Sequence, residues 1–395
     1  MRVVSVQILH CSDTHLDKSF GISNLSKAMQ RREDLNRNFS SIVDFALENK
    51  PDIFLIAGDV FDKISPSNAS RVFLTSKIKL LNDSNIATFI IGGNHDIPRF
   101  GAFPSLAIDV LGSAGIATVF SRSDVIQKKI IEVDGRSVCV SGRSYNTKSE
   151  AGNPFADVSV PVDGDYNVLL IHGSLQGLNV ASSVPEFAYQ NPFRADDIAK
   201  GLNYLALGHF HNYFEREHRG CMIVNPGSIE KLSWAEMNDE KGFVWAEIDG
   251  KETTTQFVKL QTRPMEMEEL VLSKDGKYGK GIKGYVLEFL DKHSDPEKIF
   301  KLSLSGLISQ SQYNDLKINE ILRACNDLFF NLRVDRRELE IEGYGRVFME
   351  RLDNPVEAYS KRLDLLISKL KPDDPERELL EKAKSLGVKY LEATA

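Results

Sequence analysis

The feature that most constrains the fold of this chain is a series of short apolar runs rich in valine and isoleucine. The runs are Val3–Leu9, Ile53–Ala57, Thr88–Ile91, Val168–Ile171 and Leu205–Leu207. They lack the alternation of a strand with one solvent-facing side, which predicts strands buried on both faces. Helical stretches at Leu25–Asn49 and Asn68–Asn82 separate the first three runs. This β-α-β-α-β order predicts an α/β fold with parallel strands and right-handed crossovers.

A polar cluster follows each apolar run. The clusters contain five of the eight histidines in the chain, and aspartate or asparagine supplies their other metal-ligating side chains. Because the carboxyl ends of parallel strands share one edge of a sheet, we expect all five clusters to meet at that edge. Oxygen and imidazole donors suit manganese, iron or zinc-like ions better than calcium or a thiolate-bound metal. The candidate ligands are Asp13, His15, Asp59, Asn94, His172, His209 and His211.

These residue types predict a two-metal phosphoesterase. Two cations that share a hydroxide and clamp a phosphoryl group need a carboxylate between them. Asp59 is the expected bridge, because Gly58 has no Cβ and lets the backbone approach the site. One ion position is expected to be completed by Asp13, His15 and His211, and the other by Asn94, His172 and His209.

Three further residues of the clusters are assigned roles next to the ligands. His95 follows the expected ligand Asn94 and is the candidate general acid for the leaving oxygen. Asp96 is expected to hold the His95 ring through its second nitrogen. Asp62 has two alternative roles: it is either a metal ligand or a residue that supports the ligands or caps the loop. We place it among the supporting residues.

The order of these motifs resembles the calcineurin-like metallophosphoesterase superfamily. Finer features are similar to the SbcD-type family of DNA repair nucleases, whose archaeal and eukaryotic members are named for meiotic recombination eleven. The similarity covers nearly the whole chain, and is looser beyond Lys259. The residues that carry it, besides the clusters, are Leu16, Val60, Phe61, Pro66, Ser67, Asn225–Glu230, Ser233, Glu236 and Lys241–Phe243.

The resemblance implies a manganese-dependent exonuclease or endonuclease, one subunit of a double-strand break repair complex. It implies two manganese ions, or magnesium or another divalent ion, on the seven ligands, and His95 as the catalytic histidine. Many family members have a histidine where Asp62 stands, which leaves the type of nuclease activity open. A small-molecule or cyclic-nucleotide phosphodiesterase is the alternative, since it would use the same ligands but would not need the chain beyond Leu260.

The resemblance also implies an organisation in domains. The expected parts are a β-sandwich flanked by helices over residues 1–260, a small α/β capping domain over residues 261–345 and a helical tail over residues 346–395. The tail is expected to bind an SMC-like ATPase, SbcC in bacteria. Family members commonly dimerise through helices beside the nuclease domain, and the candidates for a homodimer here are Val72–Leu81 and Phe103–Leu111.

The second half of the chain gives weaker local signals. Asp295–Leu304 is expected to be helical. Asn354 and Pro355 have the marks of a helix start, and a second tail helix is expected to end at Gly387 as its C-cap. Basic residues in loops near the metal edge are candidate DNA contacts, with Arg99 preferred. The others are Lys18, Lys63, Arg143, Lys148 and Lys231.

Composition excludes several classes of protein. Hydrophobic residues make up 42% and charged residues 27% of the chain, as in soluble globular proteins, and no apolar run approaches the ~18 residues of a membrane span. The four cysteines are scattered without metal-binding spacing, which fits a reducing cytoplasm. The net charge of -7 is not that of a protein that binds nucleic acid by bulk charge.

Overall fold

The computed structural model divides the chain into two compact units. The first comprises residues 1–266, 294–300 and 326–332, and the second comprises residues 267–293, 301–325 and 333–395. The structure describes residues 5–98, 105–147, 152–156, 158–177, 191–250, 252–343, 345–346, 355–368, 370 and 374–394. In this part of the chain no helix is long and apolar enough to cross a membrane.

The first unit contains a six-stranded sheet in the order β12-β11-β1-β2-β3-β4. Strands β1 to β4 are parallel, whereas β11 pairs antiparallel with both β1 and β12. The bounds are β1 Ser5–Cys11, β2 Ile53–Ala57, β3 Ala87–Ile91, β4 Thr118–Phe120, β11 Gly242–Asp249 and β12 Glu252–Lys259. The predicted parallel order of the first three strands is confirmed.

A second six-stranded sheet of the same unit has the order β5-β6-β7-β8-β10-β9. Its bounds are β5 Gln127–Val133, β6 Arg136–Arg143, β7 Tyr166–His172, β8 Tyr204–Gly208, β9 Phe214–His218 and β10 Cys221–Asn225. The five predicted strands therefore do not share one sheet. Three lie in the first sheet and two, β7 and β8, lie in the second, because strands that are apolar on both faces also suit two sheets packed on each other.

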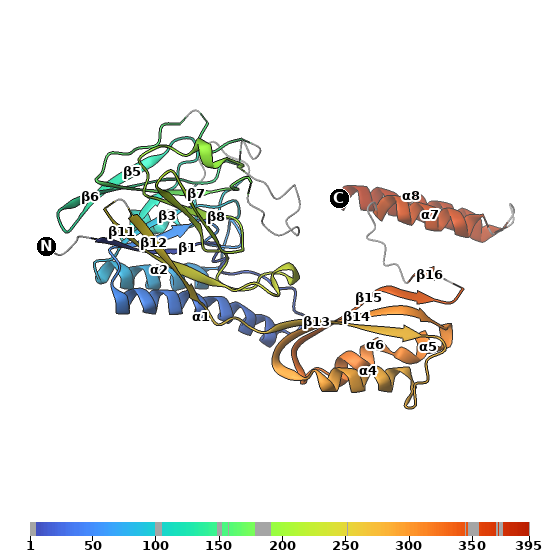
Figure 1. Ribbon diagram of the computed structural model, residues 1–395. Coiled ribbons are helices and arrows are strands. Elements are labelled where there is room, and N and C mark those ends of the chain that lie inside the picture. The colour runs from blue at the N-terminus through green and yellow to red at the C-terminus, as the bar shows by residue number, and fades with distance from the viewer. Residues whose placement is uncertain are drawn as a thin grey trace. The chain divides into compact units, whose positions relative to one another are not determined.

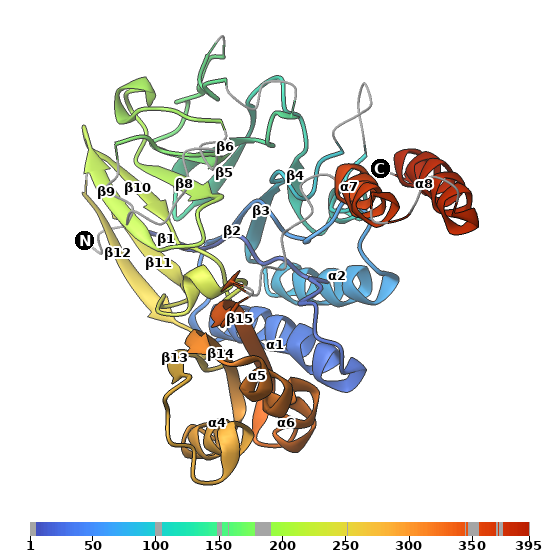
Figure 2. The same ribbon diagram turned by 90° about the vertical axis from the view of Figure 1, so that its right-hand side faces the viewer.

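Helices α1 (Leu25–Asn49) and α2 (Asn68–Asp83) cover the outer face of the first sheet (Figures 1 and 2). Each helix is capped at its N-terminus by a side chain that accepts a hydrogen bond from a main-chain N–H. The capping residue is Asn24 for α1 and Ser67 for α2. Short α3 spans Asp109–Ser113, so the predicted helix from Phe103 is wrong over residues 105–108, and residues 103 and 104 lie outside the described chain.

Two apolar layers hold this unit together. Phe54 of β2 packs toward the helices, in one cluster with Phe39 of α1. Its neighbour Leu55 points to the opposite face and packs in a second cluster with Val168 of β7. Alternate side chains of one strand thus serve two cores, which makes the unit an α/β sandwich flanked by helices, as predicted.

The remaining sheet has the order β13-β14-β15-β16, with helices α4, α5 and α6 in its connections. The bounds are β13 Met265–Ser273, α4 Gly281–Lys292, β14 Asp295–Ile308, α5 Gln310–Leu316, α6 Ile318–Ala324, β15 Phe329–Ile341 and β16 Gly345–Arg346. The prediction of a helix over Asp295–Leu304 is wrong. The segment is a strand because Phe300, Leu302 and Leu304 are buried at every second position, which is the period of a strand.

The tail forms two helices, α7 (Pro355–Ile367) and α8 (Pro375–Thr394). Pro355 is the first residue of α7, and the predicted N-cap Asn354 lies outside the described residues. The predicted C-cap at Gly387 is wrong, since α8 continues for seven residues beyond it to Thr394. Gly387 instead lies against the Tyr359 ring of α7, where a Cβ would come within 2.4 Å of ring atoms. Its lack of a side chain lets the two helices approach each other.

Candidate metal centre

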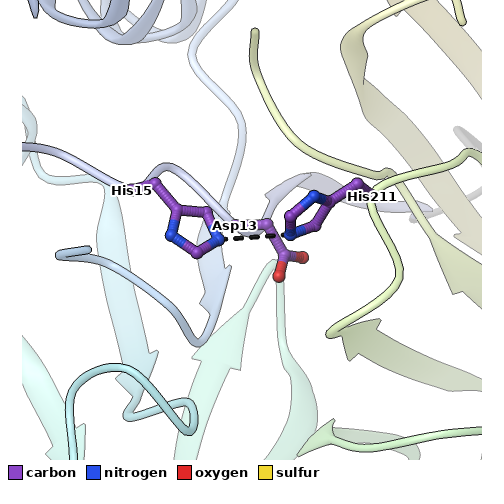
Figure 3. A group of neighbouring side chains, drawn as sticks. All are labelled: Asp13, His15 and His211. Carbon is purple, nitrogen blue, oxygen red and sulfur yellow. Dashed lines mark hydrogen bonds between the residues drawn. The ribbon is translucent and has the colours of Figure 1, made fainter. Parts of the chain in front are cut away.

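The predicted ligands converge at the carboxyl ends of strands from both sheets. Asp13 and His15 follow β1, and His211 follows β8 of the other sheet. Figure 3 shows the His15 and His211 rings facing each other on either side of the Asp13 carboxylate. One ligand atom from each of the three side chains lies within 4.8 Å of the others. The two Nε2 atoms are 3.2 Å apart.

A second group of donors gathers around Asn94. Its Oδ1 lies 3.0 Å from Nε2 of His172, the last residue of β7, and 3.2 Å from Nδ1 of His209, just after β8. These three residues are the ones that the sequence assigned to the second ion position. Asp59 lies between the groups. Its Oδ2 is 3.6 Å from Nε2 of His15 and 3.5 Å from Nε2 of His172, which is the place of a bridging carboxylate.

The backbone is bent sharply where it presents these side chains. Asp13, His15, Asp59 and His209 have positive φ angles of 49°, 41°, 47° and 107°. Non-glycine residues rarely adopt such angles, and those that do concentrate at functional sites. Gly58 has a φ of 91°, and a Cβ there would lie 2.4 Å from Nδ1 of His172. The predicted need for glycine at this position is confirmed.

Three of the histidine rings are oriented by a hydrogen bond on the nitrogen that faces away from the centre. The Nδ1 atom of His15 lies 3.1 Å from Oδ1 of Asp62, and that of His211 lies 3.1 Å from Oε1 of Glu236. The Nδ1 atom of His172 lies 2.9 Å from the carbonyl oxygen of Ala57. These acceptors place the ring hydrogen on Nδ1 and leave the Nε2 lone pairs pointing into the centre.

The arrangement fits bound cations. The Nε2 lone pairs of His15 and His211 face each other across 3.2 Å, which is repulsive unless a positive charge lies between them. Nitrogens that share one ion at about 2.1 Å each lie roughly 3 Å apart. Among the described residues, no lysine or arginine forms an ion pair with the buried carboxylates of Asp13 and Asp59. The donor set thus lacks the counter-charge that divalent ions supply.

Electrostatics within the centre point the same way. Burial raises the pKa of Asp59, but the charge and hydrogen bond of His172 and the charge of His15 outweigh it and hold that pKa well below its usual range. Burial lowers the pKa of His172, yet the Asp59 carboxylate prevails and raises it to about 9. The pocket therefore favours a positive charge, whether a proton on an imidazole or a cation.

His95 lies beside the bridging carboxylate. Its main-chain N–H donates to Oδ1 of Asp59 at 2.9 Å, and its ring packs edge-on against His15 with centroids 4.8 Å apart. The prediction that Asp96 holds this ring is wrong. The ring nitrogen Nδ1 lies 3.0 Å from the carbonyl oxygen of Asp62, so the main chain orients it.

Asp96 instead ties two loops together. Its carboxylate accepts the main-chain N–H groups of Val60, Phe61 and Gly93, at 3.0, 2.9 and 2.9 Å. Burial and the Asp59 charge nevertheless raise the pKa of Asp96, to about 7. Its role is to fix the loops that present Asp59 and Asn94, rather than to orient His95.

The basic residues predicted to contact DNA are placed as follows. Lys18 pairs with Asp62 at 2.7 Å, and Lys63 with Asp17 at 2.8 Å. Arg143 is buried, and its guanidinium donates to two main-chain carbonyl oxygens, so it is not available to a ligand. Lys231 is half-buried, and Arg99 and Lys148 lie outside the described residues.

Glu236 and Lys241 were not among the site residues that the sequence predicted, although both contact His211. Both are buried, and they lie behind His211. The sequence marked them only as part of a family resemblance, because a glutamate and a lysine five positions apart look like ordinary surface residues. A buried charged pair becomes visible only in the folded chain.

Comparison with known proteins places this geometry in a family. The family described as Calcineurin-like phosphoesterase matches residues 6–213, more than half of the 395-residue chain. The chain is 30% identical over 265 residues to the DNA double-strand break repair protein Mre11 of Thermoplasma acidophilum, covering 64% of this chain and 65% of that one. It is 26% identical over 259 residues to the uncharacterized metallophosphoesterase YhaO of Bacillus subtilis, covering 65% and 60%.

A longer match links the chain to Mre11 of Nanoarchaeum equitans, at 27% identity over 384 residues, covering 91% of this chain and 96% of that one. The chain spans only 60 to 65% of the length of the Bacillus and Thermoplasma relatives. Among solved structures, TT1561 of Thermus thermophilus is similar at a TM-score of 0.37 and 11% identity, over 64% of this chain and 98% of that one. The chain belongs to the calcineurin-like phosphoesterase family, whose members are metal-dependent hydrolases of phosphoesters.

Proposed function

We propose that this chain is a two-metal DNA nuclease of double-strand break repair, with manganese as its ion. The observation that carries the proposal is the position of Asp59 Oδ2, 3.6 Å from Nε2 of His15 and 3.5 Å from Nε2 of His172. A carboxylate in that place serves both halves of a binuclear centre, as two-metal hydrolysis of a phosphodiester requires. The relatives named Mre11 support DNA as the substrate.

Each ligand of the proposed centre has its own role. Bound ions would lower the pKa of a water molecule and offset charge on the phosphoryl oxygens. One ion would be held by Asp13, His15 and His211, the other by Asn94, His172 and His209, and both by Asp59. The hydrogen bonds behind three of the rings keep the donors oriented before substrate arrives, so little reorganisation is needed during the reaction.

His95 is the proposed proton donor. Its Nδ1 is engaged by the Asp62 carbonyl oxygen, so in the protonated ring Nε2 carries the hydrogen that the leaving oxygen receives. The main-chain bond to Asp59 sets its distance from the bridge. The Asp62 side chain orients the His15 ring. It also forms an ion pair with Lys18, so this lysine is not free to contact a phosphate. Lys63 is likewise paired, with Asp17, and Arg99 remains the preferred DNA contact of the proposal.

A single assay tests the proposal. Purified protein is given double-stranded DNA, single-stranded DNA, a bis-aryl phosphodiester and a phosphomonoester, each with manganese or magnesium. We expect DNA cleavage with manganese, and the product lengths separate exonuclease from endonuclease action. Hydrolysis of the bis-aryl phosphodiester or of cyclic nucleotides without any cleavage of DNA would establish the alternative, a small-molecule phosphodiesterase.

We also propose how the chain is organised around this activity. Residues 1–260 are the nuclease domain, residues 261–345 a capping domain that controls access of DNA, and residues 346–395 the segment that binds an SMC-like ATPase. On α8, Leu379 and Leu386 are exposed and lie seven residues apart, on one side of the helix. Such a stripe suits the apolar groove of a coiled coil.

A homodimer through α2 and the region of α3 is the remaining element of the proposal. Val72 of α2 is 69% exposed and Val110 of α3 is 49% exposed. A second copy of the chain would cover them. All four cysteines are buried free thiols, which supports a reducing, cytoplasmic setting.

A further inference from the structure

Residues 225–228, which we call the clamp segment, lie against the main chain of the loop that carries two of the predicted ligands. The segment begins at Asn225, the last residue of β10. The side chain of Asn225 is buried, and its Nδ2 donates to the carbonyl oxygens of Phe210 and Asn212, at 2.7 and 2.9 Å. These two carbonyl groups stand on either side of His211 in the chain. Both N–H bonds of one amide are therefore used to hold a ligand-bearing loop.

The carbonyl group of His211 itself is held as well. Its oxygen accepts the main-chain N–H of Ser228 at 3.1 Å and Nζ of Lys241 at 2.8 Å. Three consecutive carbonyl groups, those of residues 210, 211 and 212, thus have donors outside their own loop. Because peptide planes are rigid, fixing these oxygens also fixes the direction in which the His211 side chain leaves the main chain.

Gly227 lets the clamp segment lie close to this loop. Its φ is 81°, and a Cβ there would come within 2.5 Å of the carbonyl oxygen of His211 and 3.1 Å of the carbonyl carbon of Asn212. A side chain at this position would push the segment away from the loop. The carbonyl oxygen of Gly227 in turn accepts a hydrogen bond from Ser12 Oγ at 3.3 Å, and Ser12 directly precedes the ligand Asp13. The clamp segment therefore connects the loop after β8 to the loop after β1.

The orientation of the Asn225 amide follows from its partners. Both groups opposite its nitrogen are carbonyl oxygens, which only accept hydrogen bonds, so the NH₂ group has to face them. The Oδ1 atom of Asn225 is buried and has no hydrogen-bond partner among the residues that the structure describes. A buried acceptor without a donor is unfavourable. The two donated bonds are therefore what this side chain contributes.

The loop held in this way directs two imidazoles to different partners. The Nδ1 atom of His209 lies 3.2 Å from Oδ1 of Asn94, and Nε2 of His211 lies 3.2 Å from Nε2 of His15. Metal–ligand distances tolerate deviations of only about 0.2 Å. A small shift of the loop would thus misplace both donors together.

We propose that Asn225 is a positioning residue of the metal centre, which with Gly227 holds the loop so that His209 and His211 reach their ions together. This inference rests on the proposed two-metal function and deepens it. Asn225 donates nothing to an ion itself. It acts through the main chain of the loop, whereas the hydrogen bond from Glu236 acts on the ring of His211.

Calorimetric titration of the metal-free full-length protein with Mn²⁺ alone tests the inference. Asn225→Leu occupies a similar volume but donates no hydrogen bond, so the dissociation constant for Mn²⁺ should rise about 10–100-fold. Asn167→Leu is the matched control. Asn167, near the start of β7, is also buried, and its Nδ2 donates to the carbonyl oxygens of Gly164 and Gly201, each at 3.1 Å. Both variants should lose stability in chemical denaturation with a chelator, but only Asn225→Leu should bind Mn²⁺ more weakly.

Gly227→Ala tests the same contact with Asn225 intact. Its new Cβ should push the clamp segment off the loop and weaken Mn²⁺ binding, whereas Gly220→Ala, at a φ of 79° with open space around it, should not. Equal dissociation constants for these two variants would overturn the inference, even where Asn225→Leu does not fold.

Two other results would also overturn the inference while leaving the metal centre in place. One is an unchanged dissociation constant in Asn225→Leu, and the other is an equal rise in Asn167→Leu, which would show a merely structural role. A wild type that binds no Mn²⁺ would instead overturn the proposed function itself.

Discussion

At the scale of single residues, the centre is defined by buried polar side chains that face one another. Asp59 is buried, faces Nε2 of His15 and of His172, and is paired with no lysine or arginine within the described chain. A buried carboxylate is unfavourable without a cation, and an imidazole whose second nitrogen is engaged has one lone pair to offer. Bound cations would meet both requirements together.

The double variant Asp59→Ala, His209→Ala should lose its bound metal and remain folded. Asp59 serves both groups and His209 closes the second, so their removal leaves two incomplete sets of donors. Metal analysis after dialysis and circular dichroism measure the two outcomes. Two ions per chain in the double variant would show that these residues are not the ligands.

His95→Gln should retain metal and DNA binding but lose on the order of 10²–10⁴ in cleavage rate. The loss should be smaller on a bis-aryl phosphodiester, because a good leaving group needs little protonation. His218→Gln is the control, since His218 pairs with Asp196 outside the centre. Equal rates for His95→Gln and the wild type on DNA would remove His95 from the role of acid.

At the scale of elements, the loops after β1 and β2 are joined into one platform. The main-chain N–H groups of His15 and Leu16 donate to the carbonyl oxygens of Asp59 and Val60, each at 3.0 Å, and the N–H of Asp62 returns a bond to Leu16. Two strand ends therefore present their side chains as a unit. The positive φ angles in these loops are kept by this ladder of hydrogen bonds.

Gly58→Ala should destabilise this platform by on the order of 2 kcal/mol or more, because the new Cβ meets both an unfavourable φ and the His172 ring. Gly135→Ala is the matched control. Gly135 has a φ of 78° but open space around it, so its substitution should reduce the free energy of unfolding only through the unfavourable φ. Chemical denaturation in the presence of a chelator measures both. Equal losses would show that contact with His172 is unimportant.

At the scale of the whole molecule, the tail has two leucines that the described part of the chain leaves exposed. Leu379 and Leu386 are 66% and 62% exposed on α8, although α7 and α8 are already joined by a bond from Tyr359 Oη to the carbonyl oxygen of Ala383. The tail thus folds as a helical pair that leaves a leucine stripe uncovered. We expect a partner to cover this stripe.

Deletion of the residues after Asp353 should abolish co-purification with the SMC-like ATPase and leave cleavage of short DNA intact. The double variant Leu379→Glu, Leu386→Glu should have the same effect without removing the helices. Leu25→Glu is the control, since Leu25 is also highly exposed, on α1, but lies outside the tail. Undiminished binding by the truncated chain would rule out the tail as the docking segment.

A homodimer through α2 should be visible by light scattering at high protein concentration. Val72→Glu should convert it to a monomer, because a carboxylate cannot be buried unpaired in an apolar contact. Ile130→Glu, at an exposed position of β5, should leave the dimer intact. A wild type that scatters as a monomer would contradict the proposed dimer.

The sequence by itself determined the five strands, the two long helices and the identity of the converging side chains. These follow from local information: the apolar period defines each element, and a polar cluster at a strand end marks a site. The tertiary structure decided what depends on contacts distant in sequence. Strands β7 and β8 lie in a second sheet. The His95 ring is hydrogen-bonded to the carbonyl oxygen of Asp62 and not to Asp96. Glu236 and Lys241 contact the ring and the main chain of His211. Such hydrogen bonds form only when loops that are far apart in the sequence are positioned to within tenths of an ångström. No local pattern of residues encodes that position.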